Sequence, residues 1–340
     1  MIRVLVVDDS AAFRALLRME LERHPDLQVV GEAAELESAV RLTRTLRPDV
    51  ATMDLKMPGG SGLDAISRIM AIAPLPIILL SGEVDPRNQQ QLLEATRAGA
   101  VALETKPSSA ESREWLHLRQ LVHALADVKV MARRSAEHRP LDRGNPGRRL
   151  ELVAIGASTG GPPAIYKILE ALPAGTCTPV VLAQHLARGF TSGLATWLSS
   201  GCRLPVRIAD APISLAGPVV VIPADGQHLV VERGLARSVR AVAGEISPGV
   251  DVLFNSVAGA YGGSAVGVLL TGMGTDGARG LGLMRDRGAR TLAQDAESSV
   301  VYGMPRAAAE GGAVCEVLSL AEISKLLNRL VQTAGGDDGR

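Results

Sequence analysis

The sequence predicts an α/β protein built from two successive units, each around its own parallel sheet. Two observations predict the sheets. Short apolar runs alternate with amphipathic helical patterns over residues 1–107, and a second series of the same kind begins at Leu152. A third observation separates the units. Residues 133–149 are polar, basic and rich in proline and glycine, as is typical of a tether between domains.

Composition limits the classes of protein that this chain can belong to. Its 340 residues suffice for two cores, and 36 basic residues balance 36 acidic ones, which gives no general attraction to nucleic acid or to an anionic membrane. Only three cysteines are present, without metal-ligand spacing, and we expect no disulfide framework. No secretory leader or apolar run of membrane-spanning length is visible, so we expect a cytoplasmic protein without membrane insertion.

The first series has five predicted strands and five predicted helices. The strands are Ile2–Val7, Val29–Ala33, Val50–Asp54, Ile77–Ser81 and Ala100–Leu103, and the helices are Ala11–Arg23, Leu36–Thr45, Gly62–Ala71, Pro86–Ala98 and Ala110–Met131. Short strands linked by helices predict a parallel sheet with helices on both faces.

Polar residues follow four of these strands. Asp8 and Asp9 come after the first strand, Asp54 ends the third, and Ser81 and Lys106 follow the fourth and fifth. Parallel strands end at one edge of a sheet, so these side chains should meet there. Clustered carboxylates favour Mg²⁺, with Asp54 as a candidate phosphoryl acceptor and Ser81 and Lys106 as phosphoryl contacts. The alternative is that each acid only caps a neighbouring helix.

These residues carry a resemblance to a known family. The segments Val6-Val-Asp8-Asp9-Ser10, Met53-Asp54-Leu-Lys-Met-Pro58, Ser81-Gly82 and Lys106-Pro107 resemble the receiver domain of two-component response regulators. The resemblance implies a flavodoxin-like (βα)5 receiver, phosphorylated on Asp54 by a histidine kinase, with Mg²⁺ bound at Asp8, Asp9 and Asp54.

The second series contains a serine between glycines at the end of a strand. Strands are predicted near 152–157, 180–184, 219–222, 265–270 and 289–293, and a helix over Ala164–Leu172 follows the segment Gly156-Ala-Ser158-Thr-Gly160. The glycines permit a sharp turn that exposes the Ser158 hydroxyl beside a helix start. A phosphate-binding turn or a turn without a ligand is the alternative.

A nucleophilic serine needs a base and a group that orients the base. His185 follows the apolar run 179–183, and Asp276 follows the apolar strand before Leu270, so three strand ends could bring Ser158, His185 and Asp276 together. The glycines around Met273 would let its backbone N–H face a developing oxyanion.

Other residues compete for these roles. His228 could be the base, and Asp251 or Asp295 could replace Asp276, although neither acid stands at a glycine-bracketed strand end. Gly156, Ser158 and Gly160 also satisfy the G-x-S-x-G pattern, but in α/β-hydrolases the acid precedes the histidine. The order here is serine, histidine, aspartate.

Several segments of the second half resemble one family in particular. Ile155-Gly-Ala-Ser158-Thr-Gly-Gly-Pro162, Gln184-His185, Leu270-Thr-Gly-Met-Gly-Thr-Asp-Gly-Ala278 and Tyr302-Gly-Met-Pro305 are similar to the signatures of the chemotaxis protein-glutamate methylesterases, the CheB type. The resemblance implies a receiver domain at 1–125, a linker at 126–150 and a doubly wound methylesterase domain at 151–335.

The resemblance also implies an activity and its partners. These are hydrolysis of γ-glutamyl methyl esters on methyl-accepting chemoreceptors with release of methanol, and in some members deamidation of receptor glutamines. The esterase reaction would need no cofactor, and a histidine kinase of the chemotaxis type would supply the phosphoryl group. Ser158, His185 and Asp276 would be the triad, with Thr159 and Met273 beside it.

Two other functions remain open at this point. A non-catalytic adaptor would use the second domain only to dock on receptors. A transcription factor would need a helix-turn-helix with a basic recognition helix, and the glycine-rich, neutral second half disfavours it.

Overall fold

The chain forms two units, Met1–Arg134 and Ser135–Arg340, in a computed structural model. The structure describes residues 1–54, 56–57, 60–82, 95, 99–107, 113–126, 150–242 and 245–335. The linker predicted at 126–150 therefore lies outside the described residues except at its two ends, Ala126 and Leu150. The predicted helix Pro86–Ala98 also lies outside them, apart from Ala95.

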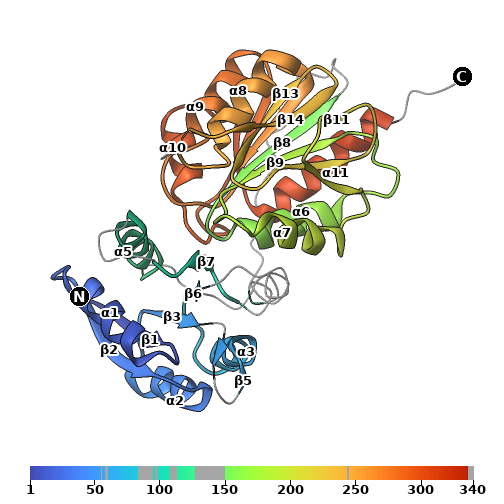
Figure 1. The fold of residues 1–340 in the computed structure, drawn as a ribbon. Coiled ribbons are helices and arrows are strands. Elements are labelled where there is room, and N and C mark those ends of the chain that lie inside the picture. The colour runs from blue at the N-terminus through green and yellow to red at the C-terminus, as the bar shows by residue number, and fades with distance from the viewer. Residues whose placement is uncertain are drawn as a thin grey trace, which may run out of the picture. The chain divides into compact units, whose positions relative to one another are not determined.

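The first unit has a five-stranded sheet in which every pair of neighbours is parallel, in the order β2-β1-β3-β6-β7. The strands are β1 (Ile2–Val7), β2 (Leu27–Ala33), β3 (Val50–Asp54), β6 (Ile77–Ser81) and β7 (Ala102–Thr105). The helices are α1 (Ala11–Glu22), α2 (Leu36–Leu46), α3 (Gly62–Ile72) and α5 (Arg113–Ala126), and β4 (Lys56–Met57) and β5 (Gly60–Ser61) form a small antiparallel pair. The strand order and parallel pairing confirm the predicted receiver-type sheet (Figure 1).

Burial explains why these runs become strands. The side chains of Val4–Val7 and Ile77–Leu80 are at most 1% exposed, as expected for central strands covered on both faces. On one face α1 packs against α5, where the rings of Phe13 and Trp115 lie 6.3 Å apart.

The second unit has a seven-stranded parallel sheet in the order β10-β12-β9-β8-β15-β16-β17. Its strands are β8 (Leu152–Ala157), β9 (Val180–Gln184), β10 (Val206–Ala209), β12 (Val220–Pro223), β15 (Ala265–Leu269), β16 (Arg290–Gln294) and β17 (Glu316–Leu318). The first strand, β8, lies at the centre. The strands that follow β8 in the chain, β9, β10 and β12, lie on one side of it, and the last three, β15 to β17, lie on the other side. The strand order therefore reverses at β8, which makes its end a topological switch point.

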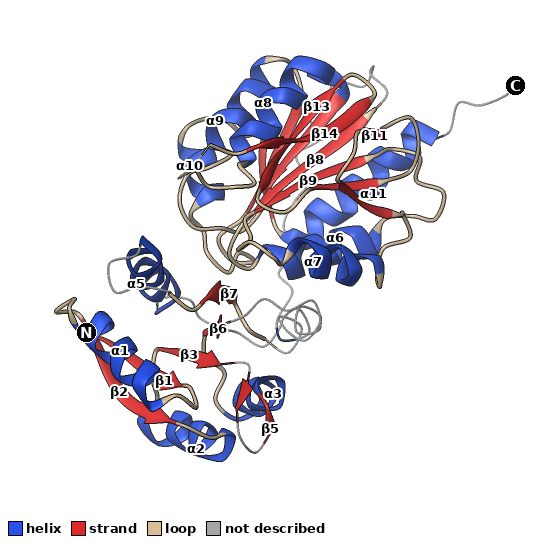
Figure 2. Ribbon diagram, viewed as in Figure 1, coloured by secondary structure: helices blue, strands red, loops and turns tan. Residues whose placement is uncertain are grey.

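Helices cover both faces of this sheet. Helices α6 (Gly161–Ala171), α7 (Thr191–Ser199) and α11 (Leu320–Gly335) lie on one face, and α8 (Val250–Tyr261), α9 (Ala278–Asp286) and α10 (Met304–Glu310) on the other (Figure 2). Helix α6 begins three residues before the predicted start, because Pro162 and Pro163 are tolerated in a first helical turn. The doubly wound prediction is confirmed.

An antiparallel sheet of three strands, which the sequence pattern did not reveal, packs against α8. It consists of β11 (Ile213–Ser214), β13 (Gln227–Glu232) and β14 (Leu235–Arg240), with β13 and β14 joined as a hairpin through Gly234. Among the described residues no helix is long and apolar enough to cross a membrane.

Candidate active site and receiver site

Ser158 is the first residue after the central strand β8. Its amide donates to the carbonyl of Thr271, 3.0 Å away, which fixes the serine beside the end of β15. Gly272 permits this closeness. A Cβ atom at position 272 would lie 2.7 Å from Ser158 Cβ and 3.1 Å from its amide nitrogen, so only glycine fits there without movement.

His185 stands opposite Ser158 across two neighbouring strands. Ala157 of β8 pairs with Gln184 of β9, and the amide of His185 donates to the carbonyl of Ala157 at 3.0 Å. The next residue on each strand is therefore Ser158 and His185, with backbones separated by about one strand spacing, roughly 5 Å. Parallel register brings the two candidate groups to the same place on the sheet edge.

The direction of the side chains also agrees with a shared site. Position 161 on α6 lies against Ala157 and Gln184, which shows that these two side chains face α6. Successive residues of a strand alternate between faces, so we expect Ser158 and His185, which directly follow the two strands, on the opposite face. Helix α8 lies on that face.

His185 is held there by Asp276. Its Nε2 lies 2.8 Å from Asp276 Oδ2, and the two side chains are 14% and 18% exposed. Nδ1 is therefore the ring nitrogen left for the serine. No hydrogen bond between the Ser158 hydroxyl and His185 is formed among the described residues. Hydrogen bonds between a nucleophile and its base often tighten only in the complex with substrate.

Asp276 also binds the first two backbone amides of helix α8. Its Oδ2 accepts the amide of Val250 at 2.7 Å, and its Oδ1 accepts the amide of Asp251 at 2.9 Å. Burial raises the pKa of Asp276, but the hydrogen bonds from His185 and from these amides outweigh it, so the net pKa lies below the ordinary value of 3.8. The carboxylate is thus kept ionised beside the imidazole.

Backbone amides near the serine are available to a ligand. Gly160, at φ +76°, starts α6, and the amide of Gly161 donates to the carbonyl of Ser158. In the described parts of the chain no hydrogen bond uses the amide of Thr159 or of Met273. Met273 follows Gly272, whose Cβ position would lie 2.7 Å from Ser158 Cβ, so its amide belongs to the segment that packs against the serine.

Three polar residues that we did not predict hold this edge together. Gln184, 4% exposed, donates its Nε2 to the carbonyls of Ser158 and His185 at 2.9 and 2.8 Å. The hydroxyl of Thr271 donates to the carbonyl of Thr159, and Gln294 Oε1 accepts the amide of Thr271. A signal was present in the sequence, because each of the three is a polar residue at the end of a buried strand.

The competing residues are engaged elsewhere. His228 accepts the amide of Gly249 at Nδ1, 2.9 Å away, and its Nε2 lies 3.3 Å from Glu245. Asp251 accepts the amide of Gly280 and pairs with Arg279. Asp295 accepts the amide and the hydroxyl of Ser298. The structure therefore brings Asp276, and not these acids, to His185.

In the first unit the predicted acidic cluster forms. Carboxylate oxygens of Asp8, Asp9 and Asp54 all lie within 4.8 Å of one another at the carboxyl edge of the sheet. Lys106 Nζ lies 2.7 Å from Asp8 Oδ2 and 3.0 Å from Asp54 Oδ2. Among the described residues, the three carboxylates of this cluster outnumber the one ammonium group bound to it, and this oxygen donor set suits Mg²⁺.

The other predicted residues of this site lie around the cluster. Ser81 is 5% exposed at the end of β6, and its carbonyl accepts the amide of Lys106 at 2.8 Å. Burial lowers the pKa of Lys106, but its hydrogen bonds to Asp8 and Asp54 outweigh this, so the pKa lies above the ordinary value of 10.5.

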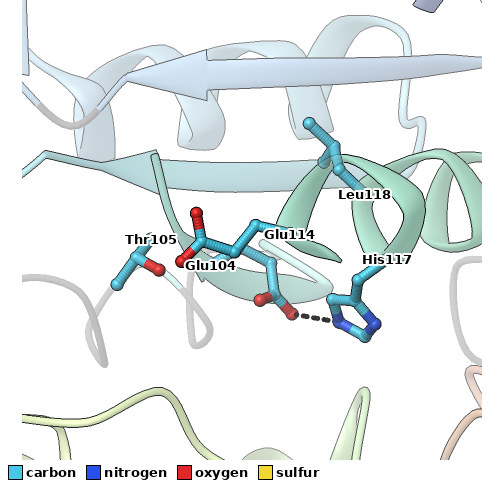
Figure 3. Close-up of a pocket in the computed structure, with 5 residues that line it drawn as sticks. All are labelled: Glu104, Thr105, Glu114, His117 and Leu118. Atoms are coloured by element: carbon cyan, nitrogen blue, oxygen red, sulfur yellow. Dashed lines mark hydrogen bonds and ion pairs between the residues drawn. The ribbon is translucent and has the colours of Figure 1, made fainter. Parts of the chain in front are cut away.

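Away from this site, the first unit contains a pocket of about 240 Å³ between β7 and α5 (Figure 3). Its lining is formed by Glu104, Thr105, Glu114, His117 and Leu118. His117 Nε2 lies 3.1 Å from Glu104 Oε1, and this hydrogen bond raises the pKa of His117 above its ordinary value of 6.5 despite burial. The pair ties α5 to the edge strand.

The fold and the two sites define a class of protein: a receiver-type domain followed by an α/β domain with a serine, a histidine and an aspartate at one sheet edge. Comparisons with known proteins agree. The family model described as CheB methylesterase matches residues 153–327, and the model described as response regulator receiver domain matches residues 4–114.

Whole proteins and a solved structure are also similar to this chain. A protein-glutamate methylesterase/protein-glutamine glutaminase 2 of Anaeromyxobacter dehalogenans (strain 2CP-C) is 43% identical over 336 residues, 97% of each chain. A protein-glutamate methylesterase/protein-glutamine glutaminase 1 of Caulobacter vibrioides is 42% identical over 338 residues, 95% of this chain and 96% of that protein. The crystal structure of the Thermotoga maritima CheB methylesterase catalytic domain has a TM-score of 0.50 and 31% identity, covering 54% of this chain and 98% of that one.

The chain belongs to the CheB methylesterase family and carries a response regulator receiver domain at its N-terminal end. It is thus an enzyme, a hydrolase of the protein-glutamate methylesterase type. Membership of this family supports neither the adaptor nor the transcription factor considered from the sequence.

Proposed function

We propose that this enzyme hydrolyses γ-glutamyl methyl esters on methyl-accepting chemoreceptors and deamidates receptor glutamines, with Ser158 as nucleophile, His185 as base and Asp276 as the group that orients the base. One observation carries the assignment of residues. Ser158 and His185 end neighbouring strands in register, and His185 is hydrogen-bonded to Asp276. The names of the relatives support the substrate class.

The reaction starts with proton transfer from the Ser158 hydroxyl to His185 Nδ1, while the serine oxygen attacks the ester carbonyl. Asp276 stabilises the imidazolium through Nε2–H. The negative charge on the carbonyl oxygen is met by the unused amides of Thr159 and Met273 and by the nearby start of α6.

Collapse of the tetrahedral intermediate breaks the bond to the methoxy group, which leaves as methanol with the proton from His185. An acyl-serine remains. His185 then takes a proton from water, whose oxygen attacks the acyl carbon, and returns the proton to the serine oxygen. The products are the glutamate carboxylate and the free enzyme. With a glutamine substrate, ammonia takes the place of methanol.

In the receiver domain, Asp8, Asp9 and Asp54 would hold Mg²⁺. The ion would neutralise charge on a phosphoryl group that a histidine kinase of the chemotaxis type transfers to Asp54. Lys106, which contacts both Asp8 and Asp54, and Ser81 would bind the phosphoryl oxygens. The oxygen donor set of the three carboxylates supports this proposal.

The proposal is tested by replacing the nucleophile. We expect Ser158→Ala to lower the rate of methanol release from methylated receptor membranes by about three orders of magnitude or more, since the loss of a triad member has effects of that size. Ser192→Ala serves as the control, because it replaces an exposed serine on helix α7. A Ser158→Ala protein with near wild-type turnover would remove Ser158 from the mechanism.

A further inference from the structure

The start of helix α8 is fixed by a buried histidine outside the proposed triad. His228, the second residue of β13, is 5% exposed, and its Nδ1 accepts the amide of Gly249 at 2.9 Å. A Cβ atom at position 249 would lie 3.2 Å from this nitrogen, so the glycine lets the imidazole approach the backbone closely. Gly249 is the residue that caps α8.

The second ring nitrogen of His228 sets its tautomer. Since Nδ1 accepts a hydrogen bond, it carries no proton, and the proton of the neutral ring is on Nε2. That nitrogen lies 3.3 Å from Glu245 Oε2, which also accepts the amide of Val242. Glu245 thus favours the tautomer that can hold Gly249.

The next two amides of the same helix terminus hold Asp276. Val250 and Asp251 donate to its two carboxylate oxygens, and Oδ2 is also the atom that faces His185. Three consecutive amides, 249 to 251, therefore link His228 to the carboxylate. A shift of Gly249 moves the adjoining amides and, with them, the carboxylate that orients the base.

We propose that His228 is a positioning residue of the esterase site, which acts through the start of α8 on Asp276 and so on His185. The inference rests on the proposed catalytic roles of Ser158, His185 and Asp276. His228 does not touch the reacting atoms. It holds the start of α8 where the amides of Val250 and Asp251 bind both oxygens of Asp276. In this position Oδ2 of Asp276 also reaches the imidazole of His185.

If His228 had a purely structural role, it would join α8 to the hairpin, and its loss would not affect the position of Asp276. Among the described residues, two backbone amides of the hairpin also donate to side chains of α8, and these two hydrogen bonds provide matched controls. The Val231 amide donates to Ser256 Oγ at 3.0 Å, and the Gly234 amide donates to Tyr261 Oη at 3.1 Å. Tyr261 ends the helix, three turns from the Asp276 carboxylate, and its ring is 7% exposed. Tyr261→Phe removes a comparable hydrogen bond between the hairpin and α8, but at the C-terminal end of the helix, far from Asp276 and His185.

The test compares three variants of the full chain in the methanol-release assay, with Ser158→Ala beside them. His228→Leu removes the acceptor. His228→Asn restores one, because its Oδ1 is as many bonds from the backbone as the histidine Nδ1. We expect kcat of His228→Leu to fall roughly 10- to 100-fold with little change in KM, since small displacements of catalytic groups have effects of this size. The acid limb of its kcat/KM profile should also move to lower pH, because the imidazolium loses its aligned carboxylate.

The controls separate the possible causes. We expect His228→Asn to regain most of the lost kcat and Tyr261→Phe to keep the wild-type kcat and pH profile. Wild-type kcat and pH profile in His228→Leu, or an equal loss in Tyr261→Phe, would overturn the inference. Failure of the proposed function looks different, because Ser158→Ala would then remain active.

A measurement on the unmodified protein covers the case in which His228→Leu does not fold. The ¹⁵N chemical shifts of the histidine rings report which nitrogen carries the proton. We expect His228 to be protonated on Nε2 alone, with Nδ1 accepting a hydrogen bond. A proton on Nδ1 would make the bond from Gly249 impossible and would overturn the proposal without any variant.

Discussion

At the scale of single residues, the Asp276 carboxylate makes two kinds of contact. It is hydrogen-bonded to His185, and its two oxygens accept the amides of Val250 and Asp251 at the start of α8. Asn at this position would keep the shape but place an NH2 group against a backbone amide or against the imidazole N–H. The residue that we propose to orient the base is thus also a residue on which the start of α8 depends.

We therefore expect Asp276→Asn to lower both activity and stability. The loss of activity should be about three to four orders of magnitude, because the imidazole loses its anionic partner. The pKa of Asp276 is lowered in the folded state, so its stabilising contribution is complete above the unfolded value of 3.8 and disappears as the pH falls through the lower folded value. Denaturant titrations of both proteins between pH 6 and pH 2.5 measure this. A stability difference that grows toward low pH would contradict the assignment.

At the scale of secondary structure elements, the contact between β8 and α8 decides whether the site can form. A Cβ atom at Gly156 would lie 2.2 Å from Val250 Cγ1 and 3.1 Å from Phe254 Cζ, so the helix packs directly on the strand backbone. Val250 is also the residue whose amide binds Asp276. Val250 therefore packs on the backbone of the strand with its side chain and binds the Asp276 carboxylate with its amide.

Gly156→Ala should push α8 away from the sheet. We expect a loss of about 1–3 kcal/mol in the free energy of unfolding, as is usual for overpacking, together with a loss of activity. Gly259→Ala on the same helix is the control, since nothing lies within 4 Å of its Cβ position, and we expect it to be neutral or slightly stabilising. Urea titration and methanol release measure the two effects. Equal behaviour of the two variants would show that the close contact is unimportant.

In the receiver domain, the link between β7 and α5 depends on pH through His117 and Glu104 (Figure 3). The hydrogen bond to Glu104 raises the pKa of His117 above 6.5, so its contribution to stability is complete below pH 6.5 and is lost as the pH rises through the higher folded value. We expect His117→Gln to be less stable than the wild type at pH 6 and equally stable at pH 9. Thermal melts at both values test this, and Glu104→Gln should behave in the same way. A difference that persists at pH 9 would assign the effect to packing.

At the scale of the whole molecule, a phosphoryl-acceptor domain and an esterase domain share one chain. Regulation of the second by the first is the function that this arrangement supports. We expect a small phosphodonor with Mg²⁺ to raise methanol release by the wild-type protein several-fold and to have no effect on Asp54→Asn, because the variant lacks the acceptor carboxylate. Stimulation of Asp54→Asn would show that Asp54 is not the acceptor.

Removal of residues 1–150 tests the direction of that regulation. If the unphosphorylated receiver restrains the esterase, the remaining fragment should be more active than the unphosphorylated full chain. Circular dichroism must show that the fragment is folded. Unchanged or lower activity of a folded fragment would contradict restraint by the receiver.

The sequence alone determined that each unit has a parallel sheet and placed several polar residues at the carboxyl edges. It missed strands β10 and β17 and the roles of Gln184, Thr271 and Gln294. Strand ends of a parallel sheet share one edge, so Asp8, Asp54 and Lys106 in one unit, and Ser158 and His185 in the other, could be placed together from their positions after apolar runs. Only the tertiary structure decided that Asp276 is bound by the start of α8, that Nε2 of His185 faces it, and that His228 holds Gly249. These contacts join segments far apart in the chain. Their hydrogen-bond geometry depends on how closely a helix packs on a sheet, and local periodicity does not encode that distance.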